Sequence, residues 1–190
     1  SMILGNICTR SCGFCNVQTG SPLPVDELEP FKVARSINIM GVKHAVITSV
    51  DRDDIKDGGS IIWAETVNAI RDLNPNTTIE TLIPDFKGET DNIDRIIKVA
   101  PEVVSHNLET VRRLTKEVRI QAKYDRSLEV LKYLKESGIS RTKSGVMLGL
   151  GEKREEVLET LDDLRSVGVD IVTLGQYLQP SKKHLPVVDF

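Results

Sequence analysis

Short apolar runs alternate with amphipathic stretches along the whole chain of 190 residues. The apolar runs predict strands at residues 2–7, 42–50, 78–83, 103–106, 142–150 and 171–175. Apolar positions at helical spacing predict helices at 26–40, 60–73, 92–100, 127–137 and 154–167, with a helical turn within 110–118. Strands that alternate with helices at this spacing are typical of parallel β/α units.

This alternation is compatible with a doubly wound open sheet, a closed barrel or a partial barrel. Six strands are too few for a complete eight-stranded barrel. In every such α/β layout, ligands bind at the carboxyl ends of the strands. A cysteine-rich loop, Asp51, Asn107, Gly149 and Tyr177 all follow predicted strands, so we expect them to share one edge. No linker interrupts the sequence, which predicts one domain over residues 1–190.

Charge and hydropathy exclude several classes of function. The net charge is −3, from 25 basic and 28 acidic side chains, and nucleic-acid binding usually requires a basic excess. No apolar run approaches the roughly 20 residues that cross a bilayer. The first residues also lack the basic and apolar regions of a signal peptide. We therefore expect a cytoplasmic protein without nucleic-acid or membrane partners.

The three cysteines of the chain, Cys8, Cys12 and Cys15, form a C-x3-C-x2-C pattern in one loop. A disulfide framework would spread its cysteines over distant loops. Buried free thiols are a second alternative, and a structural zinc site would need a fourth ligand, while all three histidines are distant in sequence. Thiolates are soft ligands that suit iron–sulfur clusters. Three of them on a four-iron cluster leave one iron free to bind another molecule.

With aromatic Phe14 before the last cysteine, this loop is similar to the signature of the radical S-adenosylmethionine superfamily. The resemblance implies a partial TIM-type (β/α)6 barrel of parallel strands. It also implies a [4Fe–4S] cluster held by Cys8, Cys12 and Cys15, whose open iron chelates S-adenosylmethionine. Reduction of that cofactor yields a 5′-deoxyadenosyl radical in the superfamily, so the three cysteines are the expected catalytic and metal-binding residues.

Six segments resemble the lipoyl synthase family more closely, in the order that the family has them. They are residues 2–17, 46–59, 106–110, 143–152, 174–180 and 184–187. The resemblance implies a sulfurtransferase that inserts two sulfur atoms at C6 and C8 of a protein-bound octanoyl chain. It further implies an octanoylated lipoyl-carrier domain as partner and a reductant such as flavodoxin or ferredoxin.

The matching segments supply a set of candidate cofactor contacts. The candidates are Phe14, Thr48, Ser49, Asp51, Asp53, Asn107, Glu109, Lys143, Met147, Gly149 and Tyr177. Asp51 and Asp53 are suited to accept charge-assisted hydrogen bonds from the cofactor ammonium group. A solvated turn that caps the next helix is the alternative for both.

The remaining candidates also have structural alternatives. The resemblance implies that Asn107 and Glu109 bind the ribose and methionine end, although such residues also cap helices. Gly149 allows a close backbone approach to adenine but is also common in turns. Tyr177 is a candidate for the adenine pocket or for packing at the rim, and Lys143 is a candidate partner of the cofactor carboxylate.

Two features of the lipoyl synthase family have no counterpart in this sequence. Family members carry a second, auxiliary [4Fe–4S] cluster, whose cysteines precede the first strand and whose serine lies near the C-terminus. Here no further cysteine exists, and Ser181 fits the serine position poorly. We expect a fragment of a longer protein that binds cluster and cofactor without completing sulfur insertion. Another radical enzyme resembling biotin synthase and a non-enzymatic iron–sulfur binding module remain alternatives.

Overall fold

A computed structural model describes all of residues 1–190. Six strands form one parallel sheet in the order β1-β4-β5-β6-β7-β8. Their bounds are β1 Met2–Ile3, β4 His44–Ser49, β5 Thr78–Leu82, β6 Val103–Ser105, β7 Arg141–Leu148 and β8 Ile171–Gln176. A separate parallel pair joins β2 Ile7–Cys8 to β3 Gln18–Thr19.

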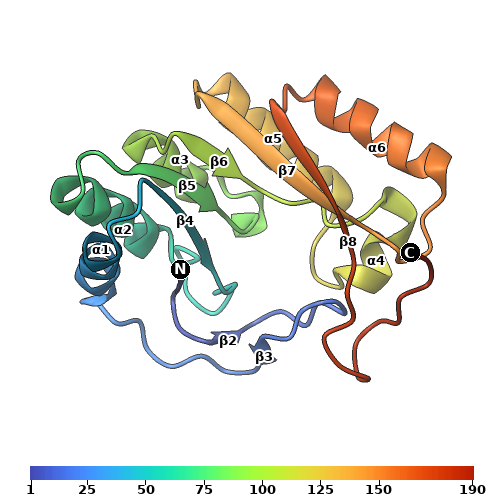
Figure 1. Ribbon diagram of the computed structural model, residues 1–190, viewed down its shortest axis with the longest axis horizontal. Coiled ribbons are helices and arrows are strands. Elements are labelled where there is room, and N and C mark those ends of the chain that lie inside the picture. The colour runs from blue at the N-terminus through green and yellow to red at the C-terminus, as the bar shows by residue number, and fades with distance from the viewer.

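Helices lie along the outer side of the curved sheet, and the segment with β2 and β3 crosses near its carboxyl end (Figure 1). The α-helices are α1 Glu29–Met40, α2 Ser60–Leu73, α3 Thr90–Val99, α4 Thr115–Val118, α5 Tyr124–Glu136 and α6 Arg154–Ser166. Two 3-10 turns, η1 Phe86–Gly88 and η2 Arg112–Leu114, precede α3 and α4. None of these helices is long and apolar enough to cross a bilayer.

The strand order decides between the three predicted architectures. Each strand of the six-stranded sheet pairs with the previous sheet strand of the chain, without a reversal of direction along the sheet. A doubly wound sheet requires such a reversal, and β1 and β8 remain at the two edges, so the barrel is open. The predicted partial (β/α)6 barrel of parallel strands is confirmed.

The first predicted strand is shorter than expected. Leu4 and Gly5 have positive φ angles of 68° and 95°, which extended backbone does not tolerate. The prediction of one strand over residues 2–7 was therefore wrong, and only β1 joins the sheet. The chain then turns away from the sheet before β2, which places the following cysteine loop beneath the carboxyl edge.

Some helix boundaries also differ from the predictions. Helix α1 begins at Glu29 instead of residue 26, because Asp26 accepts a hydrogen bond from the Leu28 backbone amide in the preceding turn. Pro30 then occupies the first turn of the helix, where its missing N–H costs nothing. Helix α5 begins at Tyr124, three residues before the predicted start, because its first turn packs into a small buried cluster with Leu131 and Leu164.

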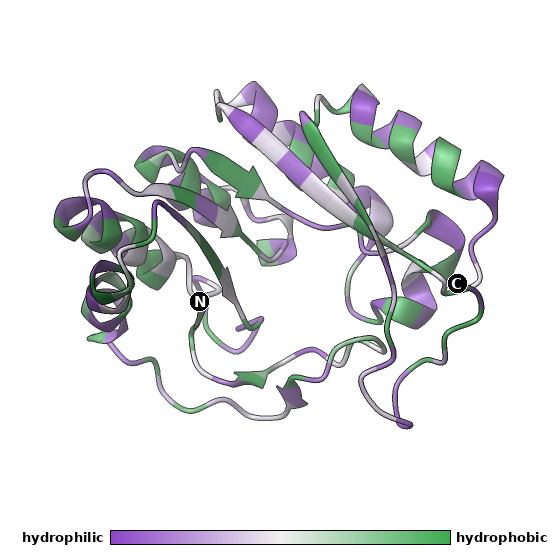
Figure 2. Ribbon diagram, viewed as in Figure 1, coloured by the Kyte–Doolittle hydropathy of each residue, from purple (hydrophilic) through white to green (hydrophobic).

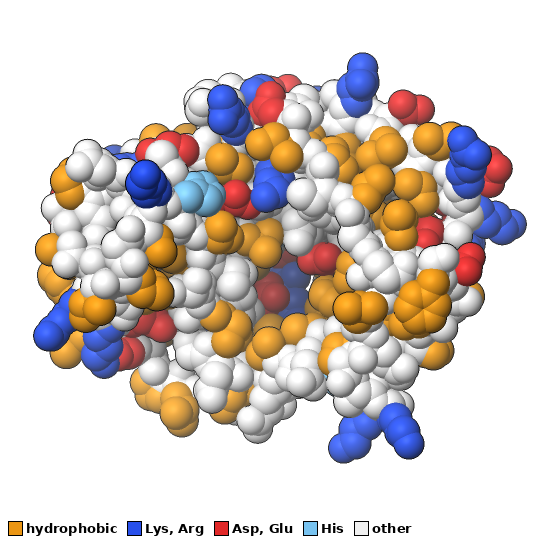
Figure 3. Space-filling view, in the orientation of Figure 1, with side chains coloured by type: hydrophobic (Ala, Val, Ile, Leu, Met, Phe, Trp, Pro, Cys, Tyr) orange, Lys and Arg blue, Asp and Glu red, His pale blue; other side chains and the backbone are white.

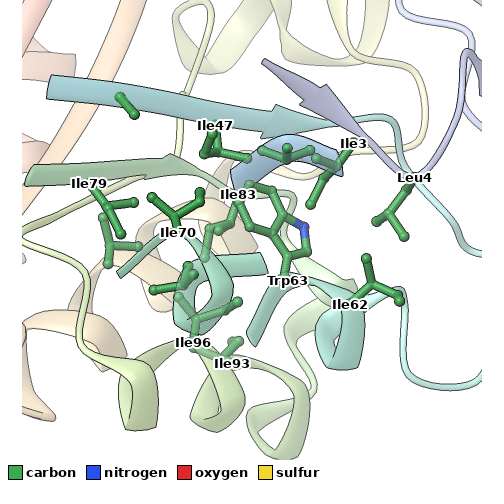
Figure 4. Close-up of a cluster of buried hydrophobic side chains, with 14 of the residues drawn as sticks. Ile3, Leu4, Ile47, Ile62, Trp63, Ile70, Ile79, Ile83, Ile93 and Ile96 are labelled. Carbon is green, nitrogen blue, oxygen red and sulfur yellow. The ribbon is translucent and has the colours of Figure 1, made fainter. Parts of the chain in front are cut away.

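The largest hydrophobic core lies between the first strands of the sheet and the helices α1, α2 and α3. Trp63 of α2 is fully buried in it, and Figure 4 shows its ring among Ile3, Ile47, Ile70 and Ile83. The helices carry both hydrophobic and hydrophilic residues, whereas β6 is mostly hydrophobic (Figure 2). This core holds the sheet edge that carries the candidate site.

Gly59, directly before α2, is a position where we expect a large effect of one added methyl group. Its φ angle is +86°, and a Cβ there would lie 2.4 Å from Leu4 Cδ1. Gly41 has a φ angle of +60° but open space around it. Gly41→Ala is expected to lower the free energy of unfolding by about 1 kcal/mol, and Gly59→Ala by about 1–3 kcal/mol more. Urea unfolding measures both values, and equal losses would contradict the packing argument.

Candidate functional site

A cavity of about 320 Å³ opens at the carboxyl edge of the sheet. The space-filling view in Figure 3 shows a hollow with acidic and basic side chains at its bottom. Nine of the predicted site residues line the cavity, together with Arg10, Asp85, His106 and Arg119. These nine are Cys8, Cys12, Phe14, Cys15, Thr48, Ser49, Asp51, Asn107 and Glu109. The structure thus brings together residues from the loops after β2, β4 and β6.

The cysteine loop, which we define as residues 8–15, is held by backbone hydrogen bonds from several directions. The Thr9 amide donates to the carbonyl of Asp51 at 3.1 Å, and the Gly13 amide donates to the carbonyl of Val118 at 2.9 Å. The Leu185 amide donates to the Gly13 carbonyl at 3.0 Å, and a Cβ at Gly13 would lie 2.9 Å from the Leu185 side chain. The loop is therefore fixed against β4, α4 and the last residues of the chain.

All three cysteines are free thiols, each partly exposed on the cavity wall. The Cys8 sulfur accepts hydrogen bonds from the backbone amides of Arg10 and Asp51 at 3.4 and 3.3 Å, which favours a thiolate. Burial acts in the opposite direction and raises the pKa of Cys8. For Cys12, burial and, to a smaller extent, the negative charge of Asp51 raise the pKa to about 12. A bound metal cation supplies the missing positive charge and deprotonates such thiols.

The donor set fits an iron–sulfur cluster. No group of three or more His, Cys, Asp or Glu side chains is arranged to hold a single metal ion. In a four-iron cluster each thiolate binds a different iron, so Cys8, Cys12 and Cys15 need only face a shared space, as they do here.

The loop after β4 contributes a half-buried carboxylate beside the cysteine loop. The Cys8 sulfur lies 3.9 Å from Asp51 Oδ2, and the Arg10 guanidinium lies 3.4 Å from Asp51 Oδ1. Burial raises the pKa of Asp51 to about 6, although the positive charge of Arg10 opposes this shift. Asp51 therefore lies at the cavity wall with an incomplete set of partners.

The segment after β6 enters the cavity with a strained backbone. Glu109 has a positive φ angle of 65°, and it is held by two backbone hydrogen bonds to β7, with Gly145 at 2.9 Å and Met147 at 2.8 Å. A Cβ at Gly145 would lie 3.0 Å from the Asn107 side-chain oxygen, so glycine makes room for that amide. Burial raises the pKa of Glu109, and the nearby positive charge of Arg119 opposes the rise.

Two of the predicted cofactor contacts outside the cavity wall are committed to ion pairs. Asp53 receives hydrogen bonds from Arg10 at 2.7 and 3.1 Å. Lys143 Nζ lies 2.9 Å from Glu80 Oε1 on the neighbouring part of the sheet. Neither residue lines the cavity, and cofactor contact by either of them stays a prediction.

Met147, Gly149 and Tyr177 also lie outside the cavity wall. Met147 packs against the small buried cluster that contains Tyr177, and the Tyr177 hydroxyl donates to the Leu185 carbonyl at 2.6 Å. A Cβ at Gly149 would lie 2.6 Å from the Asp189 carbonyl oxygen. In this structure Met147 and Tyr177 pack in a buried cluster, and Gly149 allows the chain near Asp189 to approach closely. Cofactor contact by any of the three stays a prediction.

Sequence reasoning missed three charged residues of the site. Arg10 and Arg119 are each 6% exposed and Asp85 is fully buried. Arg10 could have been suspected because it lies inside the cysteine motif. Its burial then indicates a partner, since charged side chains are rarely buried without one. Arg119 and Asp85 had no signal of that kind. His106 also lines the cavity, and its ring contacts the Ile83 carbonyl at 2.9 Å and the Ser127 hydroxyl at 2.8 Å.

Asp85 predicts a specific loss of stability in acid. Burial alone would raise its pKa, but the hydrogen bond and charge of Arg10 outweigh burial and lower the pKa to about 2. A lowered folded-state pKa means that the stabilisation is present above about pH 4 and is lost as the pH falls toward 2. The free energy of unfolding of the metal-free protein should lose about 2 kcal/mol over this range from Asp85. Asp85→Asn should remove that step in urea unfolding, and an unchanged acid limb would contradict it.

The comparisons with known proteins first define the class. The profile of the Radical SAM superfamily matches residues 2–164. SuiB from Streptococcus suis, solved with bound S-adenosylmethionine, superposes with a TM-score of 0.78 at 14% identity, over 100% of this chain and 43% of that one. Methylornithine synthase (PylB) gives a TM-score of 0.75 at 15% identity, over 100% and 56%. At these identities the structures support the fold alone, while the profile match shows that the chain belongs to the radical SAM superfamily.

Curated relatives narrow the family further. Lipoyl synthase of Christiangramia forsetii is 76% identical over 189 residues, which cover 100% of this chain and 64% of that protein. The mitochondrial lipoyl synthase of Nematostella vectensis is 76% identical with 65% of its length covered, and that of Porphyromonas gingivalis is 57% identical with 67% covered. The chain belongs to the lipoyl synthase family and spans about two thirds of the length of these relatives. Membership implies a [4Fe–4S] cluster and S-adenosylmethionine as cofactors.

Proposed function

We propose that this chain is the catalytic core of a lipoyl synthase, in which Cys8, Cys12 and Cys15 bind the [4Fe–4S] cluster that cleaves S-adenosylmethionine. The observation that carries the proposal is the arrangement of all three free thiols on one cavity wall, at the carboxyl edge of a partial barrel. The family relationship supports lipoyl synthesis as the activity that this arrangement serves.

The charges around the cavity suit a cationic cofactor. Its wall carries the acidic residues Asp51, Asp85 and Glu109 against the basic residues Arg10 and Arg119. S-Adenosylmethionine carries a sulfonium and an ammonium group. Carboxylates attract the sulfonium by charge and accept charge-assisted hydrogen bonds from the ammonium group. When bound, the cluster and this cofactor together supply a reducing electron and an adenosyl group.

The chain's own residues hold and orient the cofactor. Among the carboxylates, Asp51 is the best placed to receive the ammonium group, because it lies beside Cys8 and keeps an incomplete set of partners. Asn107 and Glu109 follow β6, and the Glu109 backbone is hydrogen-bonded to Gly145 and Met147 of β7. The Asn107 amide lies against Gly145, which suits the two residues to orient the ribose. Thr48, Ser49 and Phe14 complete the wall.

Sulfur insertion and its partners are proposed for a protein with the length of the curated relatives. The proposed substrate is an octanoyl chain on a lipoyl-carrier domain, and the proposed reductant is a small electron carrier such as flavodoxin or ferredoxin. All three cysteines of this chain stand in one loop, so no thiol remains for an auxiliary cluster. We therefore propose that the 190-residue chain cleaves the cofactor without thiolating the octanoyl chain.

Anaerobic reconstitution with iron and sulfide tests the proposal. Incubation with dithionite, S-adenosylmethionine and an octanoylated carrier peptide should give 5′-deoxyadenosine and methionine but no thiolated peptide by mass spectrometry. Failure to form 5′-deoxyadenosine with a loaded cluster would refute the proposed cofactor cleavage. Detection of lipoyl product would refute the proposed limit of this chain.

The cellular compartment is also a proposal. We propose a cytoplasmic location. The proposal needs a test because the relative from Nematostella vectensis is named as mitochondrial. Fractionation of the native cells with detection of the protein by antibody decides between the two compartments.

A further inference from the structure

Arg10 occupies an unusual position inside the cysteine loop. It stands between Cys8 and Cys12 in the sequence, yet it is only 6% exposed. Arginine is almost never buried at this level without paired charges. The side chain therefore has a structural or functional partner that the cysteine motif alone does not reveal.

The guanidinium of Arg10 joins three carboxylates from two different loops. It donates to Asp53 at 2.7 and 3.1 Å and to Asp85 at 2.7 Å, and it lies 3.4 Å from Asp51. Asp51 and Asp53 follow β4, whereas Asp85 follows β5. The planar five-donor fork of arginine suits such divided contacts, and the compact ammonium of lysine cannot reproduce them.

The backbone around Arg10 takes part in the same arrangement. The Arg10 amide donates to the Cys8 sulfur at 3.4 Å, and the Arg10 carbonyl accepts from the Thr19 hydroxyl at 3.0 Å. A shift of the Arg10 side chain thus moves an amide that contacts a proposed cluster ligand. Groups in the shell behind metal ligands set the orientation of those ligands.

We propose that Arg10 is a positioning residue that fixes the cysteine loop over the carboxyl edge of the sheet through Asp53 and Asp85. This inference rests on the proposed function, because it concerns the loop that would hold the cluster. Arg10 forms ion pairs with Asp53 and Asp85 from within the loop, and so links the loop to the ends of two strands. Without it, the cysteines lose their fixed spacing, the buried Asp85 loses its nearest cation, and the partly exposed Asp53 loses both of its hydrogen bonds from Arg10.

Arg52 offers a matched control for this role. It is 3% exposed and binds Asp54 with two hydrogen bonds of 2.9 Å, and it also donates to the carbonyls of Leu4 and Leu23. It therefore shares the burial and fork geometry of Arg10, but it makes no hydrogen bond to residues 8–15. A lysine substitution at either arginine keeps the charge and removes the fork.

The experiment compares the 190-residue wild-type chain with Arg10→Lys and Arg52→Lys. The metal-free proteins are first melted by circular dichroism, and each is then reconstituted anaerobically with iron and sulfide. The rate of iron release to a chelator is measured, and the EPR spectrum of the reduced cluster is recorded with and without S-adenosylmethionine. Asp53→Asn is included as a second variant that breaks the same contact from the other side.

We expect Arg10→Lys to release iron roughly 10-fold faster than wild type, and Asp53→Asn to release it faster in the same direction. Arg52→Lys should lower the melting temperature of the metal-free protein while keeping the wild-type release rate. Iron release that is equal in Arg10→Lys and wild type, or that simply follows melting temperature across all variants, would overturn the role of Arg10. A wild-type chain that takes up no cluster would instead refute the proposed function.

Discussion

Cys12→Ser is expected to reduce cluster iron to below about one tenth of the wild-type content and to abolish 5′-deoxyadenosine formation. A serine hydroxyl is a harder ligand than a thiolate and stays protonated near neutral pH, so it does not replace sulfur on iron. Only Cys8 and Cys15 would then remain as ligands, because the chain has no other cysteine. Iron and sulfide analysis after anaerobic reconstitution measures the loss.

A melting curve of the metal-free Cys12→Ser protein separates this loss from unfolding. Cys12 is partly exposed and forms no disulfide, so the variant should melt within about 2 °C of metal-free wild type, a shift worth less than about 1 kcal/mol. Wild-type iron content in Cys12→Ser would contradict the three-thiol site. A collapse of the metal-free fold would show that the thiol has a packing role that the structure does not indicate.

Trp63→Ala is expected to cause the largest loss of stability in the chain. The side chain is fully buried in the core behind β4 and β5 (Figure 4). Removal of a buried aromatic ring costs about 3–5 kcal/mol, from lost burial together with the cavity that remains. This is a large part of the free energy of unfolding of a typical domain, which is about 5–15 kcal/mol. Urea unfolding measures the change.

Phe31→Ala is the matched control for the Trp63 substitution. Phe31 is also aromatic and helical, but it is 68% exposed on α1. Its replacement should change the free energy of unfolding by no more than about 0.5 kcal/mol. Losses of similar size at the two positions would contradict the assignment of the core to this side of the sheet.

The fold was largely predictable because its signals are local and repeated. Alternating apolar runs and amphipathic stretches gave the parallel strands and most helices. The break after Ile3 was not predictable, because it depends on the positive φ angles of Leu4 and Gly5. Leucine has no intrinsic preference for that conformation, and it is held there by burial of its side chain in the core.

The candidate site divides in a similar way. Cys8, Cys12 and Cys15 were identifiable because the spacing of the ligands is a local sequence pattern. The structure places all three on one cavity wall. Asp53 was predicted as a cofactor contact, and its pairing with Arg10 depends on a loop that lies 43 residues away along the chain. Arg119 follows α4 and is held at the cavity by the Leu108 carbonyl and the Ser127 hydroxyl. Such long-range charge pairs follow from the folded arrangement and have no local pattern.

The measurement that tests the central claim most directly is Mössbauer and EPR spectroscopy of the anaerobically reconstituted chain. We predict one [4Fe–4S] cluster with about four iron atoms per chain, and a change in the EPR spectrum of the reduced cluster when S-adenosylmethionine is added. A mononuclear metal, or a four-iron cluster whose spectrum does not respond to the cofactor, would contradict an iron left open by three thiol ligands.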